Sequence, residues 1–212
     1  MRSHHRWLRT LAVACSCLAF AQTGYATVMV REANIVNLVG KSELILQGTV
    51  TQITDGIDKS GLPYTEVTLH VADAIRGNVG TTYTFRQFGL ISPRKMGNGL
   101  VNVMVTPDGW PTYRKGEETL LFLNPHAKIT GLQTTVGLKQ GMFRFALGGA
   151  TNHANNAGLF SRVAVDPALL TDAEKRVMST QSGAVNARAF SSLLHRIVDN
   201  RWIEQGRMRD VR

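Results

Sequence analysis

The chain has 212 residues, of which 43% are hydrophobic and 18% are charged, and its formal net charge is +9. An ordinary apolar content with a low charge density excludes a fully disordered chain, and 20 glycines without sustained heptads exclude a coiled coil. A protein with several membrane spans is excluded, because the one long apolar run lies at the extreme N-terminus.

Residues 1–26 have the pattern of a secretory signal peptide. The basic residues at the start are Arg2, His4, His5, Arg6 and Arg9. They precede an apolar stretch over residues 10–21, which is too short to cross a bilayer. Cleavage fits after Ala21 or after Ala26, and we favour Ala26 because it leaves a polar spacer in place.

Removal of residues 1–26 changes both the charge and the cysteine content. The segment holds three Arg and no acidic residue, so 21 basic and 15 acidic residues remain and the net charge falls to +6. Cys15 and Cys17 leave with it, so the mature chain has no disulfide and no thiol nucleophile. We therefore predict a protein exported through the secretory pathway, periplasmic or extracellular. The alternatives for this segment are a buried N-terminal helix and a lipidated cysteine.

The mature chain begins with a predicted short helix and a strand. Residues 34–40 predict the helix, with Asn34 as its cap. Residues 43–53 alternate apolar and polar side chains and predict the strand, with a bulge or bend at Gly48. Residues 55–61 then predict a turn-forming loop.

The middle of the chain predicts further strands. Residues 64–71 alternate most clearly, with Val67, Leu69 and Val71 on one face. Residues 118–123 form a continuous apolar run, which is typical of a strand buried on both sides. The other predicted strands cover residues 82–88, 101–105, 132–138, 142–147 and 160–165.

After these strands the apolar period changes to that of a helix. Thr171 and Glu174 form a capping-box pattern that opens a short helix ending at Met178. A final helix carries one apolar stripe, which comprises Phe190, Leu193, Leu194, Ile197, Val198 and Trp202. Residues 148–158 predict a polar loop, and residues 207–212 predict a basic, frayed tail.

Short strands at hairpin spacing, with Gly-rich turns, predict a mainly β fold: a small antiparallel OB-like barrel or sandwich. The predicted helices come before and after the strands, which argues against a doubly wound parallel sheet. We expect a signal peptide over residues 1–26, a β-barrel domain over residues 27–166 and a C-terminal helical extension over residues 167–212.

Between about residues 33 and 147 the order of elements resembles that of a known group of proteins. The resemblance rests on residues 42–50, 64–77, 113–123 and 139–145. The group consists of secreted bacterial proteins of unassigned role, whose domain is similar to the OB-type barrel of tissue inhibitors of metalloproteinases and netrin-like modules. It implies a barrel fold and a binding role. The animal inhibitors act through an N-terminal cysteine and a disulfide framework, which this mature chain lacks, so their mechanism is not carried over.

No catalytic or metal-binding motif is evident. The mature histidines are scattered, and the His-Glu-x-x-His pattern of zinc proteases is absent. They are His70, His126, His153 and His195. Ser92 and Lys95 have the Ser-x-x-Lys spacing but lack the companion motifs of penicillin-binding enzymes. The loop with Asp55 and Asp58 lacks the ligand ladder of an EF-hand. We predict no cofactor and no metal, and we favour a protein without catalytic activity.

Basic and aromatic residues alternate in the middle of the chain, and an OB-type barrel can pair such residues on a binding face. The tentative binding surface comprises Arg86, Phe88, Arg94, Lys95, Trp110, Tyr113 and Arg114. A solvated surface above core aromatics is the alternative explanation.

The leading hypothesis is an exported, non-catalytic binding module whose partner is a protein or polymer of the cell envelope or exterior. Protease inhibition is a variant of this hypothesis. The expected contact loops are residues 55–61, 88–115 and 148–158, because loops on a rigid scaffold usually carry binding. One alternative is a polyanion-binding protein. The other is a secreted hydrolase with a site assembled from Asp55, Asp58, Glu66 or His70.

Overall fold

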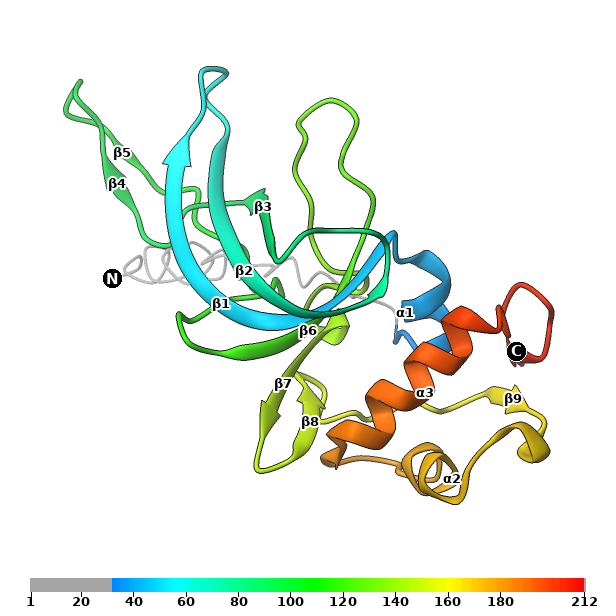
Figure 1. Cartoon of the computed structure of the whole chain (residues 1–212). Coiled ribbons are helices and arrows are strands. Elements are labelled where there is room, and N and C mark those ends of the chain that lie inside the picture. Colours follow the sequence, from blue (N-terminus) through cyan, green and yellow to red (C-terminus); the bar gives the residue numbers. More distant parts are fainter. Residues whose placement is uncertain (1–31, 212) are drawn as a thin grey trace, which may run out of the picture.

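The computed structural model describes residues 32–211, so the expected signal peptide lies outside the described residues. Within this range the protein is mainly β, with one large antiparallel sheet and three α-helices (Figure 1). In spatial order the strands of the sheet are β10 (Val185–Asn186), β8 (Gly149–Asn152), β7 (Met142–Ala146), β6 (Glu118–Leu123), β1 (Leu44–Ile57), β2 (Pro63–Arg76) and β3 (Thr82–Phe88). The edge strands β10 and β3 are not paired with each other, so strand pairing within residues 32–211 does not close a barrel.

The strands β1 and β2 form one long, bent hairpin of 14 residues each. Their pairing changes register at three points, and one of these lies between Gln47 and Gly48, which confirms the expected bulge. A Cβ on Gly48 would lie 2.3 Å from the carbonyl oxygen of His70, so this close approach requires glycine. The strands extend to Ile57 and resume at Pro63, so the prediction of a loop beginning at residue 55 was wrong.

The strand β6 separates two apolar clusters, because both of its faces are buried as predicted. Leu120 and Phe122 face the helix-side cluster, which is covered by α1 (Ile35–Lys41) and α3 (Ala187–Asp199). Leu121 and Leu123 face the inner cluster, enclosed by β1, β2 and β3. The helix-side cluster is centred on Ile35, Leu38, Ile45, Phe122, Phe143, Phe190, Leu194, Ile197 and Trp202. The inner cluster consists of Leu46, Val50, Val67, Leu69, Phe85, Leu121, Leu123 and Met142.

The strand predicted over residues 132–138 is reduced to one isolated bridge, at Thr135. The segment nevertheless makes hydrogen bonds on both sides. The Val136 N–H donates to a carbonyl of β6 and the Gln133 N–H to a carbonyl of β3, each over 2.7 Å. The chain then turns through a 3₁₀-helix (Leu138–Gly141), whose N-cap glycine is left-handed. The segment thus links β6 to β3 beside the inner cluster.

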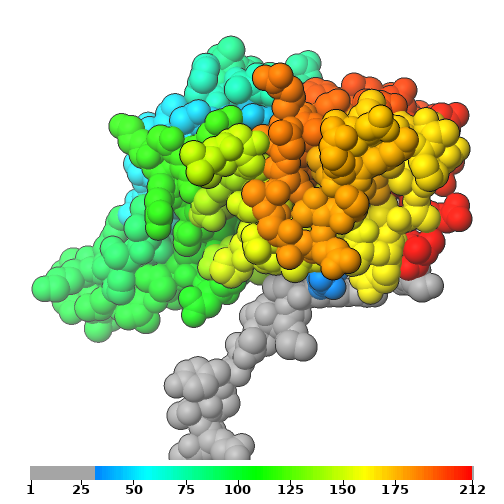
Figure 2. All heavy atoms as spheres, turned by 90° about the horizontal axis from the view of Figure 1, so that it is seen from below, coloured from blue at the N-terminus to red at the C-terminus, as the bar shows by residue number. Residues whose placement is uncertain are grey.

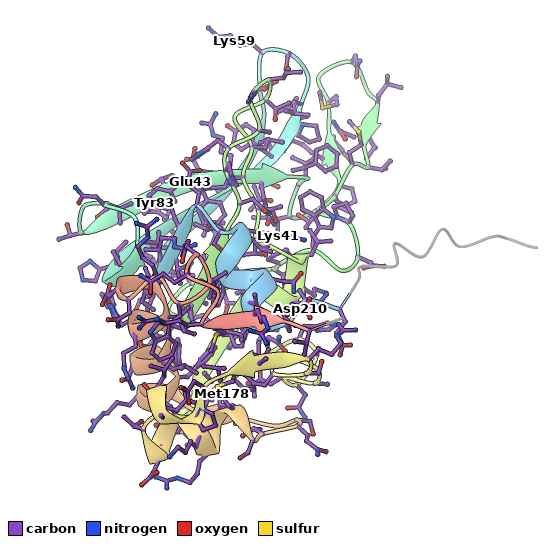
Figure 3. The ribbon with its side chains drawn as sticks, turned by 90° about the vertical axis from the view of Figure 1, so that its right-hand side faces the viewer. Lys41, Glu43, Lys59, Tyr83, Met178 and Asp210 are labelled. Carbon is purple, nitrogen blue, oxygen red and sulfur yellow. The ribbon has the colours of Figure 1, made fainter. Side chains whose placement is uncertain are left out.

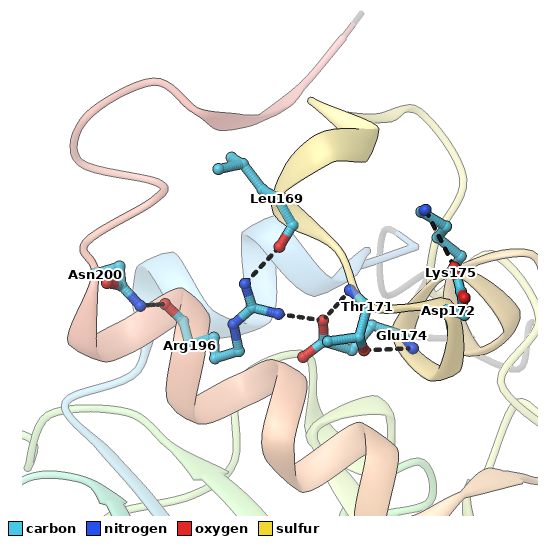
Figure 4. Close-up of polar contacts among 7 residues, drawn as sticks. All are labelled: Leu169, Thr171, Asp172, Glu174, Lys175, Arg196 and Asn200. Carbon is cyan, nitrogen blue, oxygen red and sulfur yellow. Dashed lines mark hydrogen bonds and ion pairs between the residues drawn. The ribbon is translucent and has the colours of Figure 1, made fainter.

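The two helices at the C-terminal end are joined by an ion pair whose carboxylate is buried. The helix α2 (Asp172–Met178) begins with the predicted capping box, in which Glu174 accepts a hydrogen bond from the Thr171 N–H. Glu174 is 1% exposed and also pairs with Arg196 of α3, which donates in addition to the carbonyl of Leu169 (Figure 4). None of the helices within residues 32–211 is long and apolar enough to cross a bilayer.

Two predictions for loops and tails were wrong. The strand β11 (Met208–Asp210) pairs with β9 (Val163–Val165), and Met208 is fully buried, so these tail residues are not frayed. Part of the polar segment over residues 148–158 is the strand β8. Asn156, in the same polar segment after β8, is also fully buried, and its side chain accepts from the Asn152 N–H and donates to the carbonyls of Ala150 and Gly183. The burial of Met208 explains why the tail is held in place, and the burial of Asn156 explains why the polar segment is fixed.

Candidate functional site

Residues 90–106 form a projecting hairpin, which we call the arm. Its strands are β4 (Arg94–Lys95) and β5 (Val101–Asn102). Its base is fixed because Leu90 donates to the carbonyl of Met104 at 3.0 Å and accepts from the Thr106 N–H at 2.9 Å. Figure 1 shows the arm extending away from the large sheet, and Figure 2 shows it projecting from one side of the molecule.

The arm carries most of the exposed large apolar side chains of the protein. Of the nine such side chains within residues 32–211, six lie on the arm. They are Ile91, Leu100, Val101, Val103, Met104 and Val105. Leu100 and Val103 are the most exposed, at 66% and 68%. Because apolar side chains scattered singly are normal and gathered ones are not, this surface is a candidate contact site.

Asp55 of β1 holds the arm in place. Its carboxylate forms an ion pair with Arg94, which also donates to the backbone carbonyl of Asp55 at 3.1 Å. The Ile91 N–H donates to the other carboxylate oxygen at 2.8 Å. Two residues that the sequence marked as candidate site residues, Asp55 and Arg94, are therefore partners of each other and fix the position of the arm.

A cavity of about 500 Å³ opens at the base of the arm. It is lined from β1 by Ile53, from β2 by Thr65 and from β3 by Gln87, with Ile91 and Val105 contributed by the arm. Thr106 lies at the end of the arm, and the segment after the arm adds Pro111, Thr112 and Tyr113. No lining residue is charged.

Gln87 is the most deeply buried polar residue of this lining, at 1% exposed. Its Nε2 donates to the carbonyl of Pro111 at 2.9 Å. Because a carbonyl oxygen can only accept, this bond fixes which way the amide points. The Oε1 atom is buried and has no hydrogen-bond partner among the described residues. The amide of Gln87 therefore uses its donor and leaves its acceptor buried without a hydrogen bond.

Tyr113 supplies an aromatic wall of the cavity. Its ring packs edge-on against Phe85, with the ring centroids 5.7 Å apart. The hydroxyl is buried and has no hydrogen-bond partner within residues 32–211. Burial raises the pKa of Tyr113 above the ordinary value; the positive charge of Arg144 opposes this rise and the negative charge of Glu117 adds to it. Tyr113 therefore stays neutral at physiological pH.

The other residues of the tentative binding surface have different surroundings. Arg86 donates to Glu66 at 2.7 Å, which raises the pKa of Arg86, and its guanidinium lies 4.2 Å from the ring centroid of Tyr64. Phe88 and Trp110 contact each other, with ring centroids 6.2 Å apart. The remaining two members, Lys95 and Arg114, are exposed. The basic residues are thus spread out, and the carboxylates of Glu66 and Asp55 offset two of them.

Two residues of the hydrolase alternative, Asp58 and Glu66, both interact with Arg86. Asp58 accepts from the Ser60 hydroxyl within its own turn, which lowers the pKa of Asp58 below its usual value. His70 is exposed on β2. Asp55 and Glu66 are paired with arginines, and none of the four residues lines the cavity.

Sequence reasoning missed Gln87. The alternation along β3 buries Phe85 and Gln87 on one face and exposes Thr84 and Arg86 on the other. A polar side chain at an inward position of an alternating strand is therefore the signal that could have found it.

A further polar contact, outside the cavity, joins a helix to the large sheet. His195 of α3 lies 2.8 Å from Asp73 of β2 and is itself partly exposed, so this pair joins the helix to the sheet. No group of three or more His, Cys, Asp or Glu side chains in the described part of the chain could hold a metal ion. Comparison with protein-family models, with curated proteins and with solved structures found no match for this chain.

Proposed function

We propose that this protein is an exported, non-catalytic binding module that contacts a protein of the cell envelope or exterior through its arm. The observation that carries the proposal is the gathering of six exposed apolar side chains on one projecting hairpin. The cores of protein interfaces are depleted in charge and rich in apolar groups. A monomer gains nothing from exposing these side chains to water, whereas a partner that covers them gains the hydrophobic contribution.

An OB-type barrel is part of this proposal. The strands β1, β2, β3 and β6 contribute side chains to the inner cluster, and residues 133–136 form hydrogen bonds with both β3 and β6, which supports such a barrel. The resemblance to the barrel of metalloproteinase inhibitors and netrin-like modules leads to the same expectation. In this arrangement the arm is a long connection between two barrel strands, β3 and β6, and loops on a rigid scaffold usually carry binding.

The polyanion alternative has less support. Binding to a polyanion depends on free cationic side chains and on the release of counterions. Arg86 and Arg94 have carboxylate partners in the protein. A polyanion would have to displace Glu66 and Asp55 or use only the exposed Lys95 and Arg114.

The proposal is tested by capture with tagged protein comprising residues 27–212, from envelope and culture supernatant of the source organism, at low and high salt. The arm variant is Leu100→Ser with Val103→Ser. The matched control is Ile129→Ser with Leu147→Asn, because these two side chains are fully exposed away from the arm. Asparagine is used at residue 147 because its φ is +51°.

We expect wild type and control to retain the same protein at both salt concentrations, and the arm variant to lose at least nine-tenths of it. Equal retention by the arm variant would contradict the proposal. Capture that disappears at high salt for all three proteins would favour the polyanion alternative. A captured protease that wild type inhibits and the arm variant does not would identify the inhibitor variant of the proposal.

A further inference from the structure

We propose that the tip of the arm is a modification site, at which Asn98 loses its side-chain amide and becomes aspartate or isoaspartate. This covalent change goes beyond the contact of the arm with a protein and does not depend on it. Its effect on binding rests on the proposed function: the new negative charge on the arm weakens the contact with the protein partner.

The tip of the arm holds the one Asn-Gly pair of the sequence, Asn98 and Gly99. The main-chain nitrogen that follows an asparagine can attack its side-chain carbon Cγ, and glycine has no Cβ to obstruct that approach. Gly99 has a φ of +81°, and a Cβ built on it would meet nothing within 4 Å, so the space around it is open. Both residues are exposed, so water and hydroxide reach them.

A hydrogen bond turns the side chain of Asn98 back toward the main chain. Its Oδ1 accepts from the Leu100 N–H at 3.1 Å, which brings the amide to the side on which the Gly99 nitrogen lies. The same donor draws electrons from Cγ and stabilises the negative charge that forms on Oδ1 during the attack. The bond from the Gly99 N–H to the Met96 carbonyl, at 3.0 Å, opposes the reaction. This bond lies in an exposed turn, where local opening needs little free energy.

The reaction needs only water and hydroxide. Hydroxide removes the amide proton of Gly99, and the nitrogen forms a bond to Cγ of Asn98. The bond from Cγ to Nδ2 then breaks, and Nδ2 leaves as ammonia with a proton taken from water. Water opens the cyclic imide that remains. Opening at Cγ gives aspartate, and opening at the main-chain carbonyl carbon gives isoaspartate.

The product changes the arm in two ways. Either product places an anion next to Leu100, one of the six exposed apolar side chains of the arm. The cores of protein interfaces are depleted in charge, and burial of an uncompensated charge is strongly unfavourable. Isoaspartate also adds a methylene group to the main chain, which disturbs the bond from the Met96 N–H to the Leu100 carbonyl, at 2.8 Å. Both changes act on the surface assigned to the partner.

Asn102 on the same arm is the internal control. Its Oδ1 likewise accepts from an N–H two residues later, that of Met104 at 2.9 Å. It is followed by Val103, whose branched side chain obstructs the approach of the nitrogen. The protein of residues 27–212 is incubated at pH 8, and the peptides that contain each asparagine are quantified by chromatography and mass spectrometry. We expect Asn98 to be converted about tenfold faster than Asn102, because glycine leaves the nitrogen open.

The variant Gly99→Asn tests the glycine. Asparagine tolerates a left-handed φ, so the turn is kept while a Cβ is added. We expect the conversion of Asn98 to become about tenfold slower. Thermal unfolding shows that the variant is folded.

The effect on binding is measured in the capture experiment of the proposed function. Asn98→Asp adds the charge, and Asn98→Ser removes the amide without adding a charge. We expect Asn98→Asp, and wild type incubated until Asn98 is converted, to retain about a tenth of the partner that fresh wild type retains. Asn98→Ser should retain as much as fresh wild type, since serine also accepts from an N–H two residues later.

Several results would overturn the inference. These are the absence of conversion at Asn98, equal rates at Asn98 and Asn102, and a rate that Gly99→Asn does not lower. If conversion occurs but Asn98→Asp retains the partner as well as fresh wild type does, the assigned effect on binding is wrong. If fresh wild type captures no partner, the proposed function fails, whereas the mass measurement still decides the modification of Asn98.

Discussion

The helix-side cluster and the arm contain similar apolar side chains in opposite environments. Phe143 lies 5.6 Å from Phe122 and 5.1 Å from Phe190, measured between ring centroids, and all three are fully buried. Leu100 and Val103 on the arm are about two-thirds exposed. The helices α1 and α3 cover the cluster, whereas no segment of residues 32–211 covers these arm side chains. Apolar residues stabilise the fold in the first region, and in the second they remain in contact with water.

The same contrast holds for buried amides. Asn156 lies beside the helix-side cluster and bonds through Nδ2 to the carbonyls of Ala150 and Gly183, while its Oδ1 accepts from the Asn152 N–H. Gln87 at the base of the arm uses only its Nε2. A fully bonded amide stabilises the structure, whereas the buried Oε1 of Gln87 without a hydrogen bond is unfavourable. Figure 3 shows the two regions at opposite ends of the molecule, with Lys59 of the β1–β2 turn toward one end and Met178 of α2 toward the other.

The largest difference between the two regions is expected from matched truncations. Phe143→Ala should lower the free energy of unfolding by about 4 kcal/mol, because it removes a ring from a closed core. Leu100→Ala should change the free energy by less than about 0.5 kcal/mol, because the side chain is mostly in water already. Urea unfolding followed by circular dichroism measures both values. Similar losses in the two variants would mean that the arm packs against the fold.

Gly48→Ala tests the bulge that bends β1 between the two clusters. The added Cβ would collide with the His70 carbonyl, so one of the strands must move. We expect a loss of about 2–3 kcal/mol, at the upper end of overpacking effects. Gly80→Ala is the control, because its Cβ would meet nothing within 4 Å. A loss below about 0.5 kcal/mol for Gly48→Ala would show that the bend does not depend on this glycine.

Arg196→Met tests the ion pair that joins α2 to α3. The change leaves the Glu174 carboxylate buried without its cation, and we expect a loss of about 2 kcal/mol. The value is below that of a fully enclosed pair because the Arg196 side chain is about one-third exposed. Arg188→Met on the same helix is the control, since Arg188 is exposed, and it should change the free energy by less than about 0.5 kcal/mol. Equal effects of the two substitutions would show that the Glu174–Arg196 ion pair does not stabilise the protein.

Local patterns predicted the elements whose causes lie within a few residues. The Asn34 cap, the Thr171–Glu174 capping box and the strand at residues 118–123 were confirmed, because capping and a continuous apolar run are local patterns. The pairing of β11 with β9 joins segments more than 40 residues apart, and nothing in the sequence of either strand indicates its partner. Residues 132–138 have an alternating pattern but bond to two strands at once, which no local pattern indicates.

The candidate site was predictable only in part. The sequence identified the segment at residues 88–115 as a contact region, and the arm lies within it. The sequence analysis, however, assigned the binding surface largely to cationic residues. Two of them are paired with carboxylates, Arg94 with Asp55 and Arg86 with Glu66, and these pairs form only when segments distant in the sequence come together. The cavity requires β1, β2, β3 and the arm together, so it becomes visible only in three dimensions.

Tyr113→Phe is expected to have the smallest effect at neutral pH and a distinct effect at high pH. The hydroxyl is buried without a partner, so its removal should change the free energy of unfolding by less than about 1 kcal/mol at pH 7.

Burial raises the pKa of Tyr113 in the folded protein, whereas in the unfolded chain it ionises near pH 10. The unfolded state therefore releases a proton that the folded state keeps, so wild type loses about 1.4 kcal/mol for each pH unit above about 10, through this residue alone. The Phe variant lacks this term, and all other groups titrate alike in both proteins. Urea unfolding at pH 8 and pH 11 should thus show a smaller decline in the variant, by about 1.4 kcal/mol. Parallel declines would mean that the Tyr113 hydroxyl reaches water, which would open the aromatic wall of the cavity.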